Sequence, residues 1–185
     1  MTTKVVTCPN CQHRNRVPAA AQGTPRCGNC HRPLPWIVDA GDNDFAEVVE
    51  QATIPVLVDM WAPWCGPCRR VSPVLEQLAV EKAGEVKLVK INADEAPQLS
   101  RRFNVQSIPT LLVLRQGQVV AQQVGAAAAT ALRPWLEDAI HKEVASWPPP
   151  STHTWRWCVR CGRAHPRAAR SVCDSTRPGC TSGSA

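Results

Sequence analysis

Cys65 and Cys68 carry the clearest chemical signal in this chain, because two residues separate them within Trp64-Cys65-Gly66-Pro67-Cys68. An apolar run, Val56-Leu57-Val58, precedes the pair, and an amphipathic segment, residues 71–82, follows it. This context predicts a strand-to-helix junction, where first-turn N–H groups and the helix dipole stabilise a thiolate. Cys65 is then a nucleophile near neutral pH. Cys68 lies about one helical turn further along, where it can attack a mixed disulfide formed at Cys65.

This segment resembles the active site of the thioredoxin family, and the resemblance extends over residues 39–142. Within that range, Ser107-Ile108-Pro109-Thr110 is similar to the family's cis-proline loop. The alternatives for an isolated C-x-x-C are half of a zinc knuckle or a structural disulfide, whereas the strand–helix context and the second loop favour redox chemistry. The resemblance implies an α/β thioredoxin fold and a protein dithiol–disulfide oxidoreductase without a bound organic cofactor. It implies disulfide-containing proteins and an NADPH-dependent thioredoxin reductase as partners.

Asp59 stands in the otherwise apolar segment six residues before Cys65. A buried carboxylate is costly unless its pKa rises and it exchanges protons. Asp59 matches the family's buried aspartate, which implies that it helps to deprotonate the resolving thiol, Cys68. Lys90 matches the lysine that approaches this carboxylate, and the alternative for Lys90 is an edge position that faces solvent.

Pro109 is expected to shape the loop next to the cysteines, because a cis proline lacks an N–H and turns the chain sharply. The backbone of Ile108 can then face the sulfur atoms and pair with an extended substrate. With Trp64, Pro67 and Gly125, Ile108 is expected to form an apolar substrate groove around the cysteines. Trp61 is expected to pack in the core and support the loop.

Alternating patterns predict the elements that position these residues. Parallel strands joined through helices, followed by an antiparallel pair, predict a mixed sheet covered on both faces. The segments, in order, are a helix over 44–52, a strand over 54–61, a helix over 65–82 containing Pro73, a strand over 86–92, a helix over 96–103, hairpin strands over 111–115 and 119–124, and a helix over 127–142.

Four cysteines near the N-terminus fall as Cys8-x2-Cys11 and Cys27-x2-Cys30, fifteen residues apart. This spacing is typical of a zinc ribbon, in which two knuckles hold one tetrahedral Zn²⁺ through four thiolates. The alternatives are two structural disulfides or four loose thiols. A ribbon joined to such a domain resembles the thioredoxin 2 subfamily over residues 1–142. That likeness implies a zinc-bound ribbon whose cysteines respond to oxidation.

The charge is distributed unevenly over three predicted parts: a ribbon (residues 1–35), a thioredoxin domain (36–146) and a tail (147–185). The net charge of +6 comes from the two ends, since the central part carries fourteen acidic and ten basic side chains. Nucleic-acid binding is therefore not predicted from the basic total. From Trp147 onward nothing resembles the family, and the Pro, Arg and Ser content predicts disorder.

Two alternatives apply to the tail: a second zinc knuckle and an out-of-frame ending. The knuckle would use Cys158, Cys161, Cys173 and Cys180, with His165 as a further candidate ligand.

The start of the chain is polar and already carries two cysteines, which predicts no secretory signal, and no run of 18 apolar residues predicts a membrane span. Ten cysteines without a signal favour metal and redox sites in a cytoplasmic protein. The protein is expected to be a monomer. The second functional class is a binding module, in which the ribbon recognises a partner or senses oxidants and the remaining domain acts as a chaperone or scaffold.

Overall fold

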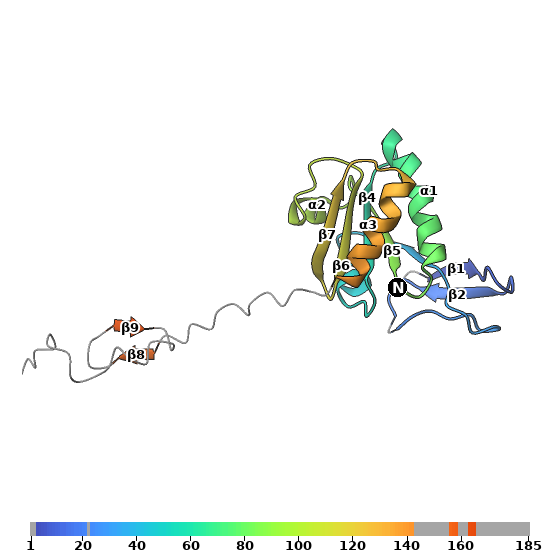
Figure 1. Ribbon diagram of the computed structural model, residues 1–185, viewed down its shortest axis with the longest axis horizontal. Coiled ribbons are helices and arrows are strands. Elements are labelled where there is room, and N and C mark those ends of the chain that lie inside the picture. The colour runs from blue at the N-terminus through green and yellow to red at the C-terminus, as the bar shows by residue number, and fades with distance from the viewer. Residues whose placement is uncertain (1–2, 22, 143–155, 159–162, 166–185) are drawn as a thin grey trace, which may run out of the picture. The chain divides into compact units, whose positions relative to one another are not determined.

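The computed structural model describes residues 3–21, 23–142, 156–158 and 163–165. Residues Met1–Ala145 and Ser146–Ala185 form two units, and each is described by itself. The centre of the first unit is a five-stranded sheet in the order β3-β5-β4-β6-β7 (Figure 1). Its strands are β3 (Trp36–Asp39), β4 (Val56–Trp61), β5 (Lys87–Asn92), β6 (Thr110–Arg115) and β7 (Gln118–Val124).

The sheet is mixed, as the sequence predicts. β5 pairs in parallel with both β3 and β4, whereas β6 pairs antiparallel with β4 and with β7. β6 and β7 form the antiparallel hairpin, and β6 joins this hairpin to the parallel part of the sheet through β4.

Helices cover both faces of this sheet (Figure 1). α1 (Gly66–Glu81) and α3 (Ala129–His141) share one buried cluster with Leu57 of β4. On the other face, the single π-helical turn η1 (Ala46–Glu50) and α2 (Pro97–Arg102) pack with Val58. Since successive side chains of a strand point to opposite faces, Asp59 lies on the face that α1 covers. The expected fold class is confirmed.

The N-terminal segment forms a short antiparallel hairpin, β1 (Thr3–Thr7) with β2 (Arg14–Pro18), which the sequence analysis did not predict. Val17 and Leu34 are buried in one cluster with Trp36 of the central sheet. The Trp36 indole Nε1 donates a hydrogen bond to the Pro18 carbonyl at 3.0 Å. The segment is therefore packed against the central domain, and the two share part of their core.

Lys87 contributes an unusual contact to this packing, because the whole side chain is 1% exposed. Its ammonium Nζ donates to the Ala19 carbonyl at 2.7 Å and to the Val48 carbonyl, and lies 4.1 Å from the centre of the Trp36 ring. Burial lowers the pKa of Lys87 to about 8. The carbonyl groups and the aromatic face replace the hydration that the ammonium loses.

Gly84, in the turn after α1, is a second point of close approach. Its φ of +93° suits glycine, and an added Cβ would lie 2.9 Å from the Cβ of Pro33. The Thr24 hydroxyl also donates to the Gly84 carbonyl at 3.5 Å. The segment around Pro33 therefore packs against this turn.

In the second unit, β8 (Arg156–Cys158) and β9 (Arg163–His165) form an antiparallel pair. The sequence analysis expects no regular structure here, so over these six residues the expectation differs from the structure. Cys161, Cys173 and Cys180, with the zinc alternative that depends on them, lie outside the described residues. Among the helices described, none is long and apolar enough to cross a membrane.

Candidate functional site

Cys65 and Cys68 form a disulfide at the start of α1, with 5.3 Å between their Cα atoms. Cys65 is the N-cap of α1, and its Sγ accepts a hydrogen bond from the Cys68 backbone N–H at 3.1 Å. Ala62, half-buried Trp61 and half-buried Ile108 pack against the pair. On reduction, a charge at Cys65 would be stabilised by the Cys68 backbone N–H and by the positive end of the helix dipole.

Asp59, on the α1-covered face of β4, is 1% exposed. Its Oδ2 accepts a hydrogen bond from the Ser72 hydroxyl at 3.0 Å, and its Oδ1 has no hydrogen-bond partner among the described residues. Burial raises the pKa of Asp59 to about 6, against the lowering effects of the Ser72 hydrogen bond and the Lys90 charge. The carboxyl group can therefore change its protonation state near neutral pH.

Lys90 lies beside Asp59 in the register of β4 and β5, but its Nζ donates to Glu76 Oε1 at 2.9 Å. The resemblance to the family implies that Lys90 approaches Asp59, whereas nothing in the sequence pattern predicts this ion pair with α1. The Lys90 charge still lowers the pKa of Asp59, while the Glu76 charge raises it. Lys90 thus acts on Asp59 through space, with its hydrogen bond given to Glu76.

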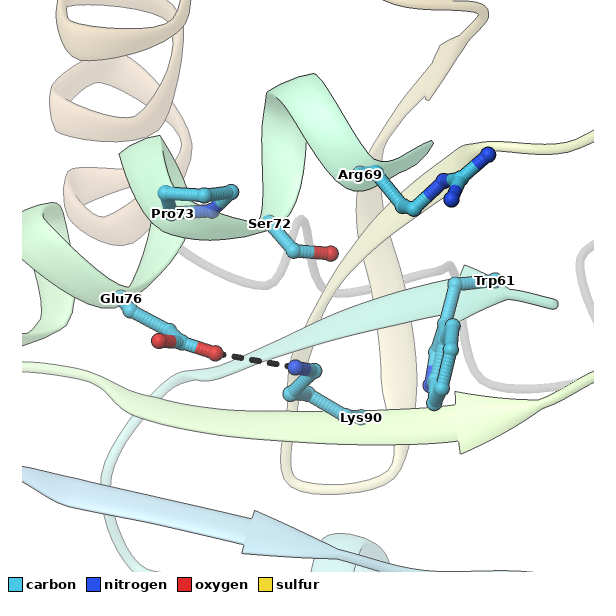
Figure 2. A pocket seen from close by; sticks show the side chains of 6 residues that line it. All are labelled: Trp61, Arg69, Ser72, Pro73, Glu76 and Lys90. Carbon is cyan, nitrogen blue, oxygen red and sulfur yellow. Dashed lines mark hydrogen bonds and ion pairs between the residues drawn. The ribbon is translucent and has the colours of Figure 1, made fainter. Parts of the chain in front are cut away.

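A pocket of about 390 Å³ opens next to Ser72, the residue that donates to the Asp59 carboxylate. Figure 2 shows its lining from α1 above and from β4 and β5 below, with the Ser72 hydroxyl turned toward the space over Lys90 and Trp61. Its lining residues are Trp61, Arg69, Ser72, Pro73, Glu76 and Lys90. The pocket is large enough to admit water to the neighbourhood of Asp59.

Replacing Asp59 with Asn should stabilise the protein near neutral pH and leave its stability in acid nearly unchanged. The pKa of Asp59 is 3.8 ordinarily and about 6 in the fold. The folded state therefore binds the proton more tightly, and the stability that this supplies below pH 3.8 is lost as the pH rises through about 6. The loss is about 3 kcal/mol. We expect Asp59→Asn to gain about 2 kcal/mol at pH 7, measured by urea unfolding.

The same measurement at pH 3.5 is the control, because both proteins then carry a neutral side chain at position 59. An equal change at the two pH values would contradict the assignment of the effect to a buried charge.

The residues expected to contact substrate lie near the disulfide and differ in their exposure to solvent. Trp64 is 69% exposed, and its Nε1 donates to Asp94 Oδ2 at 2.8 Å, which fixes the indole on the surface. Pro67 is also exposed, whereas Ile108 is half-buried and packs against the cluster of Ala62, Cys65 and Cys68. The indole and Ile108 therefore present apolar surface next to the cysteine pair.

The Ile108–Pro109 peptide bond is cis, as the resemblance implies. The Pro109 carbonyl accepts a hydrogen bond from the Gly125 N–H at 2.8 Å. Gly125 has a φ of +87°, a conformation that favours glycine. Gly125 is thus placed next to the cis-proline loop, and its expected part in a substrate groove stays a prediction.

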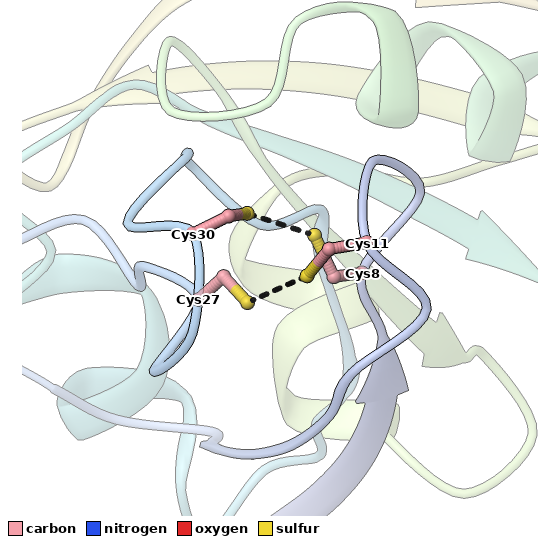
Figure 3. Close-up of side chains that lie close together, drawn as sticks. All are labelled: Cys8, Cys11, Cys27 and Cys30. Carbon is pink, nitrogen blue, oxygen red and sulfur yellow. Dashed lines mark hydrogen bonds between the residues drawn. The ribbon is translucent and has the colours of Figure 1, made fainter.

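Cys8, Cys11, Cys27 and Cys30 form a compact cluster of free thiols (Figure 3). Their Sγ atoms all lie within 4.8 Å of one another, with Cys8 and Cys30 at 3.6 Å and Cys11 and Cys27 at 3.5 Å. Four thiolates at about 2.3 Å from a tetrahedral Zn²⁺ are about 3.8 Å apart, so the spacing fits such an ion. The donor set therefore suits one zinc ion.

The two knuckles repeat the same turn. The Gln12 N–H donates to the Cys8 carbonyl and the His31 N–H donates to the Cys27 carbonyl, each at 3.0 Å. Gln12 and His31 have positive φ values of 58° and 59°. These left-handed residues directly follow Cys11 and Cys30, the second cysteine of each pair.

Backbone groups prepare part of this cluster for ionisation. Hydrogen bonding from the Cys30 backbone N–H, helped by that of Asn29, lowers the pKa of Cys27 to about 6, against the effect of burial. Burial raises the pKa of Cys8 to about 11. Backbone N–H groups directed at a sulfur atom stabilise its thiolate, which is the form of cysteine that binds a metal ion.

Three side chains of the active site were not anticipated: Ser72, Glu76 and Asp94. Ser72 and Glu76 follow Cys68 at intervals of four residues, so both share its face of α1. That spacing is a signal that could have found them. Asp94 has no comparable signal, because its contact with Trp64 joins two loops.

A cysteine pair that closes into a disulfide at the start of a helix, on a mixed sheet, defines a thiol–disulfide oxidoreductase. A family model described as Thioredoxin matches residues 36–138. The chain is 49% identical over 104 residues to the thioredoxin of Haemophilus influenzae, which covers 56% of this chain and 97% of that protein. It is 34% identical over 142 residues to Thioredoxin C-3 of Corynebacterium nephridii, over 75% of this chain and 97% of that protein. The chain belongs to the thioredoxin family.

Proposed function

We propose that this chain is a thioredoxin 2-like protein-disulfide reductase with a zinc ribbon packed on its catalytic domain. The observation that carries the proposal is the Cys65–Cys68 disulfide at the N-terminus of α1, next to the cis-proline loop. The four-cysteine cluster supports the assignment to the thioredoxin 2 type. The parts of the chain are then a ribbon (1–35), the thioredoxin domain (36–146) and a tail (147–185).

The reaction begins with the reduced pair. The Cys65 thiolate attacks one sulfur of a substrate disulfide, forms a mixed disulfide and expels the other substrate sulfur as a thiolate, which takes a proton from solvent. Cys68 then loses its proton and attacks the Cys65 sulfur. The second substrate sulfur leaves as a thiolate, which takes a proton from solvent, and the enzyme is left as the Cys65–Cys68 disulfide that the structure contains. Two electrons pass from the enzyme to the substrate.

Asp59 is the base that accepts the Cys68 proton in the second step. Ser72, which donates to the Asp59 carboxylate, follows Cys68 by about one turn on the same face of α1, so the carboxylate and the resolving thiol lie on the same side of this helix. A carboxyl group with a pKa of about 6 can take up a proton and release it again near neutral pH. Lys90 helps to keep Asp59 ionised through its charge.

Substrates bind along the surface that Trp64, Pro67, Ile108 and Gly125 form around the cysteines. The backbone of Ile108 pairs with an extended substrate segment, because Pro109 turns the chain toward the disulfide. The exposed indole of Trp64 supplies apolar contact that does not depend on one substrate sequence. Brief docking of many unrelated protein disulfides follows from such a surface.

One Zn²⁺ is held by Cys8, Cys11, Cys27 and Cys30. The ion supplies folding free energy to a segment of about 35 residues that has little core of its own. Oxidation of these thiols would remove the ligands, which makes the ribbon redox-responsive.

An NADPH-dependent thioredoxin reductase returns the disulfide to the dithiol, so the chain itself binds no organic cofactor. The expected setting is the cytoplasm, with the protein acting as a monomer that binds neither nucleic acid nor membranes. The exposed indole next to the disulfide supports a surface that a reductase can also dock on.

The second candidate is a zinc-binding or oxidant-sensing module on a thioredoxin scaffold. The close cluster of four free thiols is the observation that favours it. In that case the central domain would act as a chaperone or scaffold, and its disulfide would not turn over.

The first test is reduction of insulin by the full chain with NADPH and a bacterial thioredoxin reductase, with the metal content measured on the same sample. We expect catalytic NADPH oxidation that depends on the chain, and close to one zinc per molecule. A folded, zinc-loaded protein without turnover would favour the second candidate. Two zinc ions per chain would show that the tail contributes a site.

A further inference from the structure

Ser72 lies between the buried carboxylate of Asp59 and the pocket that opens beside it. Its hydroxyl donates to Asp59 Oδ2 at 3.0 Å, and the same residue lines the pocket (Figure 2). Asp59 is 1% exposed, and its other oxygen has no partner among the described residues. Within that part of the chain, Ser72 is therefore the only side chain that hydrogen-bonds to this carboxylate.

The charged groups around Asp59 do not replace this contact. From β5, Lys90 lowers the pKa of Asp59 through its charge, but its ammonium donates to Glu76. From α1, the Glu76 charge raises the pKa of Asp59, and Arg69 lines the pocket without a hydrogen bond to Asp59 among the described residues. The register partner of Asp59 on β6 is Leu111, which is apolar. Because the ionised carboxylate has so few other stabilising contacts, the hydrogen bond from the Ser72 hydroxyl contributes strongly to its stability.

A serine hydroxyl also has capacity left after this bond. Ser72 Oγ donates its one hydrogen to Asp59 and keeps two lone pairs, which can accept hydrogen bonds from water in the pocket. The hydroxyl therefore connects a buried acid to the water-accessible side of α1.

We propose that Ser72 is a positioning residue for the redox reaction, whose hydroxyl orients the Asp59 carboxylate and stabilises its ionised form while Cys68 is deprotonated. The inference rests on the proposed role of Asp59 as the base. Removal of a hydrogen bond to an ionised carboxylate disfavours that form, so Asp59 must then lose its proton at a higher pH. Release of the mixed disulfide would slow in the range where the wild-type Asp59 is already ionised.

The test compares Ser72→Ala with wild type in two measurements on the full chain. The first is the titration of the Asp59 carboxyl carbon, followed by NMR in the reduced protein. The second is the pH profile of the rate at which the mixed disulfide is resolved. We expect Ser72→Ala to move the titration upward by about one pH unit, and the acid limb of the rate profile to move with it.

Two variants serve as controls. Ser72→Thr keeps a hydroxyl at the same position and should titrate like wild type. Ser100→Ala removes a partly buried hydroxyl of α2 that donates to the Ala96 carbonyl, and it should shift neither measurement. A uniform loss of rate without a shift in Ser72→Ala would overturn the inference, and so would an equal shift in Ser72→Thr.

Asp59→Asn separates this inference from the proposed function. If Asp59→Asn resolves mixed disulfides at the wild-type rate and pH dependence, the role of Asp59 as base is wrong, whatever Ser72 does to its titration. If Asp59→Asn resolves mixed disulfides slowly while Ser72→Ala titrates like wild type, the role of Asp59 as the base is supported and the role of Ser72 is refuted.

Discussion

Cys65→Ser is expected to abolish disulfide reduction, with a fall in turnover of about 1,000-fold or more. Serine has nearly the shape of cysteine, but its hydroxyl does not ionise near neutral pH and cannot exchange with a disulfide. The backbone donor at Cys68 N and the dipole of α1 remain in place, so the change removes the nucleophile alone. NADPH oxidation coupled to insulin reduction measures the loss.

Cys68→Ser should give a different failure, because Cys65 can still attack. The mixed disulfide then has no resolving thiol, and the variant should accumulate as a covalent complex with its substrate. Non-reducing electrophoresis would show this complex in Cys68→Ser and not in Cys65→Ser. Persistent turnover by either variant would contradict the assigned order of attack.

The core of this site could be predicted from sequence because it depends on local patterns. An apolar run before Cys65 and a helical period after it were sufficient for the β4–α1 junction, and the observed helix, Gly66–Glu81, lies one residue inside the expected limits. Asp59 stands out in sequence as the only charge in its strand. Its burial at 1% exposure follows from the same pattern.

Features that depend on tertiary pairing were missed. β3 has only four residues, and it is a strand because Trp36–Asp39 pairs with Lys87–Lys90 of β5. A four-residue run next to two prolines carries little periodicity of its own. The fold also decides the partner of Lys90, since Glu76 reaches it from α1. Sequence spacing alone indicates only that a lysine lies near the aspartate.

The burial of Lys87 is another feature that local sequence patterns do not predict. Its type and its position at the start of a strand predict a solvent-exposed side chain. The docked N-terminal segment instead buries it and supplies the Ala19 carbonyl as a partner. The knuckle spacing indicates a metal site, but it does not indicate which face of the domain covers it.

The double variant Cys8→Ser, Cys11→Ser should lose its zinc and retain most of its reductase activity. Structural zinc sites of this kind contribute about 10 to 16 kcal/mol of metal binding, so removal of two of four thiolates should reduce the zinc content from about one per chain to nearly none. The ribbon contacts β5 at Lys87, where the strand begins, whereas the active site follows the other end of β4, at Trp61. A six-residue strand separates these ends by about 17 to 20 Å.

Loss of the ribbon fold should nevertheless lower the thermal stability of the whole domain. Trp36 would lose its hydrogen bond to the Pro18 carbonyl, and the Lys87 ammonium would lose the Ala19 carbonyl. We therefore expect a lower Tm together with near wild-type turnover at temperatures where the domain stays folded. The variant His13→Ala, His31→Ala is the matched control, because both side chains adjoin the knuckles without belonging to the thiol cluster, and it should keep its zinc. Loss of turnover in a still-folded cysteine variant would mean that the ribbon takes part in catalysis, and zinc loss in the histidine variant would refute the four-thiolate ligand set.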